Sequence, residues 1–402
     1  MNLQQHKRQL MLLMILLLFV SQAGTDIYIS GLPQMTREFH TQVATMNLSI
    51  TLYVYAQAVF FLFMGVISDI FGRRKTLLVC ILAQIIASQA IALTASLSLM
   101  LLLRMIQALG SGAIYIVLRL IIKDILPKVE QIHATGLLVI GLVLSPALAP
   151  AVGAWIIHYG TWRNCFTLIA VLQSLLWLWA FILIPETNLK IANFRANFSF
   201  SHHLGSYYKV LSDKFFITVV LIVGGTFASF YSFISISSYM YIDEYHISKI
   251  LYAYTFIGVA GAYLLGNRLM LGLNKRRVSP WRILSYGIVL ALGGILLMFV
   301  GLLCRNSALL LLGLTTCGIF LIRAATAYIN PPLQVAVTHH FGAAGSHALG
   351  LLSCFQYVFA GLGSAVVAAL PLLPSRSLFY SSLGFTLISV LGFYLCPKAE
   401  LA

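Results

Sequence analysis

Twelve long apolar runs constrain the fold of this chain more than any other feature of its sequence. Each run is close to the ~20 residues that an α-helix needs to cross the hydrocarbon core of a bilayer. Charged or turn-forming segments separate the runs, so we expect an all-α integral membrane protein with twelve transmembrane helices. The runs are residues 9–29, 43–66, 76–95, 97–119, 132–157, 163–184, 215–240, 249–272, 281–303, 307–328, 345–369 and 378–396.

The composition agrees with a membrane protein and excludes several other classes. The chain is 60% apolar and only 9% charged, whereas a soluble domain carries about 25% charged residues. Its net charge of +15 is explained by cations in short segments on one side of a membrane, so no nucleic-acid partner is expected. The six cysteines are scattered without a C-x-x-C motif, so no metal site is expected. No nucleotide fingerprint and no convincing nucleophile–base pair is found, so we expect no enzyme and no cofactor.

The distribution of lysine and arginine predicts the orientation of the chain. With the N-terminus inside, eighteen of the twenty-five cations lie on the cytoplasmic side and five on the outer side, while Arg104 and Arg323 lie within apolar runs. Both termini are therefore expected in the cytoplasm. A cleaved signal peptide is the alternative for the first run, because Lys7 and Arg8 precede an apolar core that ends in small residues near Ala23. Against cleavage, the run continues past Ala23.

One long polar interruption, residues 185–214, divides the chain into six runs and six runs. We expect residues 1–184 and 215–402 to form two pseudo-symmetric halves, with 185–214 as a cytoplasmic linker on the membrane surface. Glycine and basic residues at 266–277 echo those at 65–75 about 200 residues earlier. This echo indicates that the halves are distant copies of each other.

The echoed stretch, GVISDIFGRRK at 65–75, resembles the signature loop between helices 2 and 3 of the major facilitator superfamily. The resemblance implies the major facilitator fold, in which two six-helix halves enclose a binding site. It also implies a gating loop whose acid meets a helix N-terminus or a cation on the neighbouring half. The alternative is a plain positive-inside anchor. The pattern G-x-x-x-D-x-x-G-R-(R/K) is matched by Gly65, Asp69, Gly72, Arg73 and Arg74.

Asp26 is the only one of the ten acids that lies within an apolar run. A carboxylate there costs roughly 2.5–3.5 kcal/mol on insertion scales, so it marks a function by default. Desolvation favours the neutral acid, which suits Asp26 to exchanging a proton. Gln22 and Thr25 share its helical face and are expected to line a cavity. The alternative is that Asp26 caps a frayed outer helix end near residues 29–33.

Two further stretches resemble the Bcr/CflA branch of drug:proton antiporters and the proton-coupling motif of the superfamily. They are TDIY at 25–28, followed by Leu32-Pro33, and R-x-x-Q-x-x-G-x-G beginning at Arg104. The resemblance associates Arg104 with proton coupling.

Asp26 lies ~18 residues from the inner end of its helix and Arg104 ~7 residues from the outer end of its own, so at ~1.5 Å per residue both fall in the outer half of the membrane. We therefore predict that Arg104 lies within reach of Asp26, directly or through water, and tunes its proton affinity. The alternative is an Arg104 that snorkels to the interface. Arg104 shares one face of its helix with Gln107, Ser111, Tyr115 and Arg119.

The fifth run resembles the antiporter-specific motif G-x-x-x-G-P-x-x-G-G, with Ser145 at a usual glycine position. The resemblance implies export, in a helix kinked by its prolines and packed against a helix of the other half. The alternative is ordinary small-residue packing without directional meaning. The matching residues are Gly141, Pro146, Pro150 and Gly153.

The substrate cavity is expected to combine aromatic and hydroxyl groups, which suit amphipathic and often cationic solutes. Aromatic packing is the alternative for the seventh run, and His339, His340 and His347 are interpreted as solvated loop histidines. The expected cavity residues are Gln22, Tyr28, Gln107, Ser111, Tyr115, Phe230, Tyr231 and Gln356.

These expectations describe a monomeric exporter of drugs or related amphipathic molecules in the bacterial inner membrane. It would work by alternating access and exchange protons for substrate, with the proton gradient as its energy source. Its partners would be the small-molecule substrate, protons and the lipid bilayer. A dedicated exporter or importer of one metabolite, such as a siderophore, is the first alternative. A membrane sensor without transport is the second.

Overall fold

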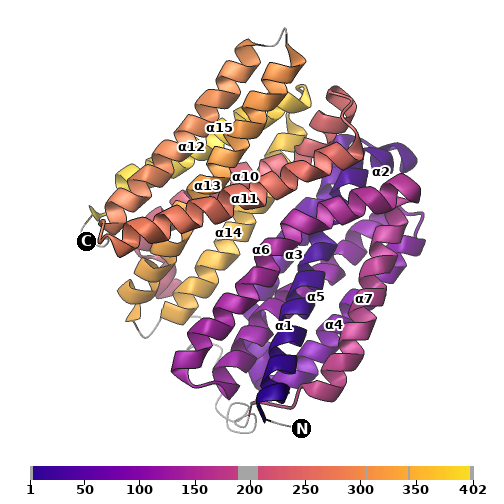
Figure 1. Cartoon of the computed structure of the whole chain (residues 1–402), viewed down its shortest axis with the longest axis vertical. Helices are drawn as coiled ribbons and strands as arrows, with labels where there is room; N and C mark the ends of the chain where they lie inside the picture. The colour runs from indigo at the N-terminus through magenta and orange to yellow at the C-terminus, as the bar shows by residue number, and fades with distance from the viewer. Residues whose placement is uncertain (1–2, 189–206, 305–306, 343–344, 399–402) are drawn as a thin grey trace. The chain divides into compact units, whose positions relative to one another are not determined.

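The computed structural model describes residues 3–188, 207–304, 307–342 and 345–398. These residues form helices and no strand, and they confirm the expected all-α fold (Figure 1). Eleven helical segments among them are long and apolar enough to cross a membrane, and α6, which covers the fifth apolar run, is a further long helix. The long helices are α1 (Leu3–Asp26), α3 (Val43–Phe71), α4 (Arg73–Leu93), α5 (Leu97–Ile125), α6 (Lys128–Tyr159), α7 (Trp162–Leu183), α10 (Lys214–Ser238), α11 (Lys249–Lys275), α12 (Pro280–Leu303), α13 (Ala308–His340), α14 (Gly345–Ala369) and α15 (Pro374–Leu395).

Several helices extend beyond the apolar runs that predicted them. α3 and α4 together cover nearly all of the stretch 65–75, and only Gly72 lies between them, with φ +95°. Glycine adopts this φ without the steric cost that a Cβ would bring. The expected gating loop is therefore a single-residue joint between two helices. α13 continues through Pro331 and Pro332 to His340, because neighbouring helices in a membrane bundle satisfy the backbone groups that proline frees.

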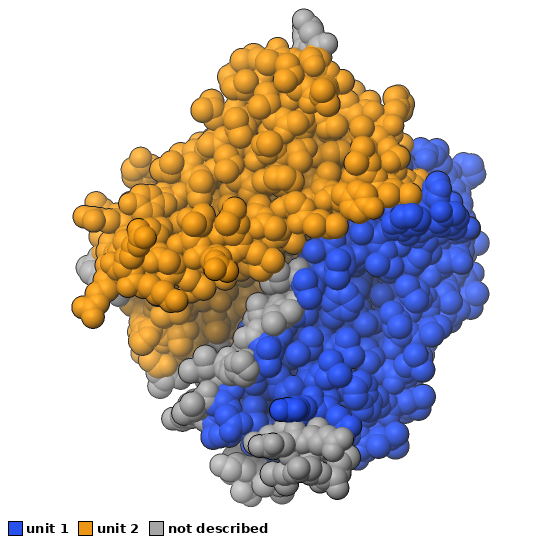
Figure 2. All heavy atoms as spheres, viewed as in Figure 1, with its two compact units in different colours: residues 1–42, 52–198 blue, residues 43–51, 199–402 orange. Residues whose placement is uncertain are grey.

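Two compact units make up the chain (Figure 2). The first unit comprises residues 1–42 and 52–198, and the second comprises residues 43–51 and 199–402. Most of α3 thus belongs to the first unit, and its first nine residues to the second. The division of the sequence at 185–214 stays a prediction.

In the first unit, α1 packs on α6 and α7, and α4 packs on α5 and α7. Glycines permit the closest approach: a Cβ added to Gly153 of α6 would lie 1.7 Å from the carbonyl oxygen of Ile27, and one added to Gly141 would lie 2.8 Å from that of Ile15. Such small residues let helix backbones approach. The glycines of the fifth run therefore contact the first helical segment of their own unit. The expected packing of this helix against the other half stays a prediction.

In the second unit, α10 packs on α14 and α15. A Cβ added to Gly363 of α14 would lie 2.2 Å from the carbonyl oxygen of Ala228, so these two helices are in direct backbone contact. The Ser232 hydroxyl donates to the Gly363 carbonyl (3.1 Å), and the Ser229 hydroxyl donates to that of Ser382 (3.2 Å). These serine hydroxyls of the seventh run therefore bind neighbouring helices.

Candidate functional site

Asp26 is the last residue of α1, and its side chain is only 3% exposed. After it the chain continues through a 3₁₀ turn at Ile29–Gly31 into a short helix, α2 (Leu32–Glu38). The helix thus ends three residues before the end of the first apolar run at residue 29. The carboxyl group is buried, as expected of a functional acid within an apolar run. It also lies at the end of its helix, as expected of an acid that caps a helix end.

Arg104 of α5 is fully buried beside the end of α1. Its guanidinium donates to the Gly24 carbonyl (2.9 Å), to the Gln107 side-chain oxygen (2.5 Å) and to the Tyr28 hydroxyl (3.2 Å). The same group lies 4.2 Å from the centre of the Tyr53 ring. These contacts fix the cation in the interior of the unit, so Arg104 does not reach an interface by snorkelling.

Tyr53 of α3 connects the end of α1 to α5. Its hydroxyl accepts a hydrogen bond from Thr25 (3.0 Å) and donates to Ser111 (2.7 Å). Because Thr25 directly precedes Asp26, the first of these bonds brings the Tyr53 hydroxyl to the end of α1. Three residues that the sequence singled out, Thr25, Arg104 and Ser111, therefore lie around one phenol ring.

The polar cluster continues from Arg104 into α4. Gln107 donates to the Ser88 hydroxyl (2.8 Å), which donates to the Gln84 carbonyl (2.7 Å). The Ser21 hydroxyl of α1 donates to the Gln84 side chain (3.1 Å). Gln107 is thus directed into the helix bundle, where it binds α4.

Sequence analysis missed five members of this cluster, one of which is Ser21 of α1. Tyr53 and Gln57 stand four residues apart in the second run, on one helical face, and Gln57 donates to Ser111 (3.2 Å). That spacing was a usable signal. Gln84 and Ser88 have the same spacing in the third run.

The first unit holds two more of the predicted cavity residues, Gln22 and Tyr115. Gln22 is buried in α1, and the half-buried Tyr115 packs on Phe61 and carries the Arg119 guanidinium 4.5 Å from its ring centre. Hence Tyr115 forms an aromatic and cationic contact in the second half of α5, one turn beyond Ser111.

In the second unit, buried Phe230 and Tyr231 lie on α10 and buried Gln356 on α14. The Arg323 guanidinium of α13 lies 4.0 Å from the Phe230 ring centre and 4.7 Å from that of Tyr263. Such geometry is that of a cation–π contact. Arg323 is therefore held among aromatic rings within its own unit.

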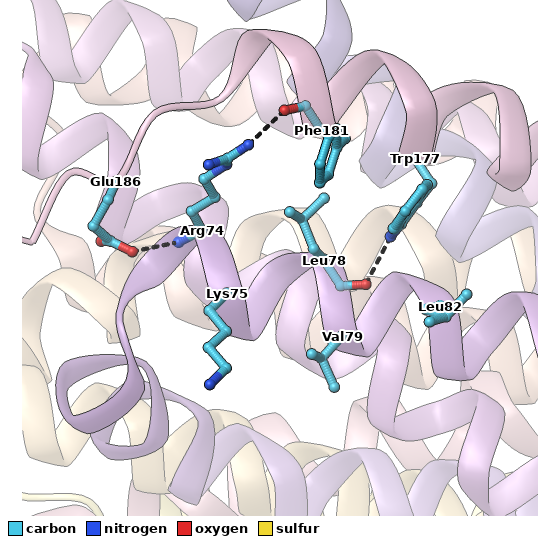
Figure 3. Close-up of a pocket in the computed structure, with 8 residues that line it drawn as sticks. All are labelled: Arg74, Lys75, Leu78, Val79, Leu82, Trp177, Phe181 and Glu186. Carbon is cyan, nitrogen blue, oxygen red and sulfur yellow. Dashed lines mark hydrogen bonds between the residues drawn. The ribbon is translucent and has the colours of Figure 1, made fainter.

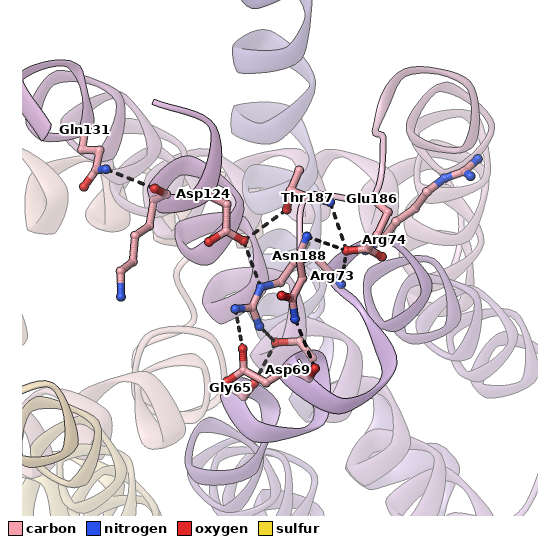
Figure 4. A network of polar contacts seen from close by, with 11 residues as sticks. Gly65, Asp69, Arg73, Arg74, Asp124, Gln131, Glu186, Thr187 and Asn188 are labelled. Carbon is pink, nitrogen blue, oxygen red and sulfur yellow. Dashed lines mark hydrogen bonds and ion pairs between the residues drawn. The ribbon is translucent and has the colours of Figure 1, made fainter. Parts of the chain in front are cut away.

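The joint between α3 and α4 is held by Arg73 (Figure 4). Its guanidinium pairs with Asp69 one turn earlier (2.5 Å) and with Asp124 at the end of α5 (3.2 Å), and it donates to the Ser68 hydroxyl (2.5 Å). The expected partner of Asp69 was a helix N-terminus or a cation on the neighbouring half. The structure pairs it with Arg73 of its own signature stretch.

The N-terminus of α4 is bound by Glu186, which follows α7. The two Glu186 carboxylate oxygens accept from the backbone N–H groups of Arg73 (2.9 Å) and Arg74 (3.2 Å). An acid at this position complements the unpaired N–H groups and the helix dipole. Asn188 donates to the Asp69 carbonyl (3.1 Å), so the residues after α7 bind both sides of the joint. Neither Asp124 nor Glu186 was singled out from the sequence, and only the proline before Glu186 marked the end of the helix.

His340 at the end of α13 pairs with Asp213 before α10 (3.1 Å). Partial burial acts to raise the pKa of Asp213, but hydrogen bonds from the Phe216 N–H and from His340 outweigh it and hold the pKa below its usual value. His340 is exposed, as expected of a solvated histidine, but it is the last residue of α13 and not a loop residue, and its ring joins two helix ends.

Residues 14–364 match the family model described as Major Facilitator Superfamily. The chain belongs to the major facilitator superfamily. This transporter is similar to an "Uncharacterized transporter" of Rickettsia felis, with 26% identity over 71% of this chain and 70% of the relative. It is also similar to "Multidrug resistance protein D" of Escherichia coli K12, with 30% identity over 42% of this chain and 43% of that protein.

Solved structures show the same fold for this superfamily member. A D-xylose-proton symporter superposes with a TM-score of 0.72 at 15% identity, covering 98% of each chain. A POT family transporter superposes with a TM-score of 0.76 at 12% identity, covering 97% of this chain and 96% of the other. The protein is thus a multi-pass membrane transporter of the major facilitator type.

Proposed function

We propose that this transporter is a proton-coupled exporter of drugs or related amphipathic molecules, of the Bcr/CflA type. The observation that carries the proposal is the burial of Asp26 beside the cluster of Arg104 and Tyr53. A carboxyl group at membrane depth is costly, so its presence indicates by default a role in transport or in a proton relay. A fixed guanidinium nearby supplies a permanent positive charge, because arginine does not lose its proton in proteins.

The chemistry of such a site is an exchange between a proton and a substrate. When Asp26 takes up a proton, the cluster around Tyr53 gains one unit of positive charge. In a poorly solvated interior, this added charge interacts strongly with neighbouring polar groups. Release of the proton restores the negative charge, which attracts a cationic or hydrogen-bonding solute. In the proposed cycle, Asp26 is protonated from outside, and substrate from the cytoplasm displaces the proton as the two halves rock.

The names of two relatives favour drugs as substrates. Two similar proteins of Escherichia coli are named "Multidrug resistance protein D", at 30% identity, and "Multidrug resistance protein MdtM", at 23% identity. The aromatic rings of Phe230 and Tyr231 also suit an amphipathic solute. We place the protein in the bacterial inner membrane as a monomer with both termini in the cytoplasm, since most of its cations then lie inside.

Transport into inverted inner-membrane vesicles tests the direction and the coupling. We expect an imposed proton gradient to drive uptake of a lipophilic cation by the wild type and not by Asp26→Asn. Glu130→Gln is the control, because Glu130 is an exposed acid in the first turn of α6. Uptake that persists without a gradient, or that survives Asp26→Asn, would overturn the proposal. Gradient-driven movement of a single metabolite out of these vesicles would favour the alternative function, a dedicated importer of one metabolite.

A further inference from the structure

A surface cavity of about 420 Å³ lies between α4 and α7, at the end where α4 begins (Figure 3). The distribution of cations assigns this end to the cytoplasmic side. The cavity has an apolar wall and a basic mouth, and it is distinct from the Tyr53 cluster. Its lining residues are Arg74, Lys75, Leu78, Val79, Leu82, Trp177, Phe181 and Glu186.

The wall of the cavity is apolar and open. Val79 is 57% exposed and Phe181 is 50% exposed, and Leu82 is exposed one turn further along α4. The Trp177 indole N–H donates to the Leu78 carbonyl (2.9 Å), so its ring stands fixed at the side of the groove. Exposed side chains of this kind on a transmembrane helix face lipid acyl chains.

The mouth of the cavity carries two cations. Arg74 lies 5.2 Å from the centre of the Phe181 ring and donates to the Phe181 carbonyl (2.7 Å), while its buried Nε has no hydrogen-bond partner. Lys75 is exposed, and no acid among the described residues forms an ion pair with it. The third charged group, Glu186, already accepts from two backbone N–H groups of α4. The mouth therefore has a net positive charge and unused donors.

We propose that this cavity binds an anionic phospholipid of the surrounding leaflet. Arg74 and Lys75 bind its phosphate, and one acyl chain lies along Val79, Leu82 and Phe181. Basic pockets between transmembrane helices on the cytoplasmic side are suited to such head groups. A free phosphate would contact only the cations, whereas a phospholipid contacts both the cations and the adjoining apolar wall.

Native mass spectrometry of the detergent-purified protein tests this site. The protein is titrated with phosphatidylglycerol and, separately, with phosphatidylethanolamine, and bound lipid is counted. We expect Arg74→Gln/Lys75→Gln to weaken phosphatidylglycerol binding by roughly tenfold, since each cation near the surface contributes measurably. The matched control is Arg276→Gln/Arg277→Gln, which removes two exposed cations between α11 and α12 and should leave binding within twofold of the wild type.

A second variant, Leu82→Trp, keeps both cations and narrows the cavity along its apolar wall. We expect this variant also to bind phosphatidylglycerol more weakly. If the site bound only the phosphate, the substitution would leave binding unchanged. Equal binding by the wild type and the double variant would refute the site. An equal loss in the control pair, full competition by inorganic phosphate, or equal affinity for phosphatidylethanolamine would each refute a specific anionic-lipid site.

Discussion

Replacing Arg73 by glutamine removes the cation that joins α3, α4 and α5. Arg73 is buried, while the side chains of its partners Asp69 and Asp124 are 30% and 22% exposed. Breaking a fully buried ion pair costs about 3–5 kcal/mol, and an exposed pair contributes at most about 1 kcal/mol. With two partly exposed partners, we expect Arg73→Gln to lower the free energy of unfolding by about 2 kcal/mol.

Reversible unfolding in mixed micelles measures this change, and Lys75→Gln is its control. Lys75 is a cation on the same helix turn that makes no ion pair within the described part of the chain, so we expect a change of no more than about 0.5 kcal/mol. Double-mutant cycles of Arg73→Gln with Asp69→Asn and with Asp124→Asn should each give a coupling of about 1 kcal/mol. If Arg73→Gln is no more destabilising than Lys75→Gln, or if both couplings vanish, the network does not hold the joint.

Two further predictions concern packing and pH. Gly153→Ala should lower the free energy of unfolding by about 2 kcal/mol, because the new methyl group would overlap the Ile27 carbonyl. Thermal unfolding measures this change. The control, Gly261→Ala, should show no such loss, because its added methyl group would meet nothing within 4 Å. Asp213→Asn should destabilise the protein at neutral pH, because the pKa of Asp213 is held below its usual value by a backbone N–H and by His340 despite partial burial. A carboxyl group with a lowered folded-state pKa stabilises above its unfolded pKa, and this contribution is lost as the pH falls through the folded value. The difference in melting temperature between wild type and Asp213→Asn should therefore disappear in acid, and a difference that is independent of pH would contradict the assignment.

The helices could be predicted from the sequence because each requires only a local apolar run. Their ends were harder to predict. The tenth run stops at residue 328 because Asn330, Pro331 and Pro332 look like a break, yet α13 continues to His340. Tertiary packing compensates for the missing proline hydrogen bonds, and a single sequence does not display that packing.

The polar sites were predicted in part, for a similar reason. Asp26 and Arg104 stand out because charge is rare in apolar runs. Tyr53 stands out only through its spacing from Gln57, and Glu186 does not stand out, since an acid after a proline is ordinary. Their roles depend on partners 58 and 113 residues away, Ser111 and Arg73. Only the fold brings such partners together.

Proton release from the detergent-purified transporter tests the central claim most directly. A panel of lipophilic cations and small metabolites is added to wild type, to Asp26→Asn and to Glu130→Gln in weakly buffered solution, and the pH is recorded. We predict that at least one compound releases protons from the wild type and from Glu130→Gln but not from Asp26→Asn. Binding without proton release in all three proteins, or release that persists in Asp26→Asn, would contradict the exchange of proton and substrate at Asp26.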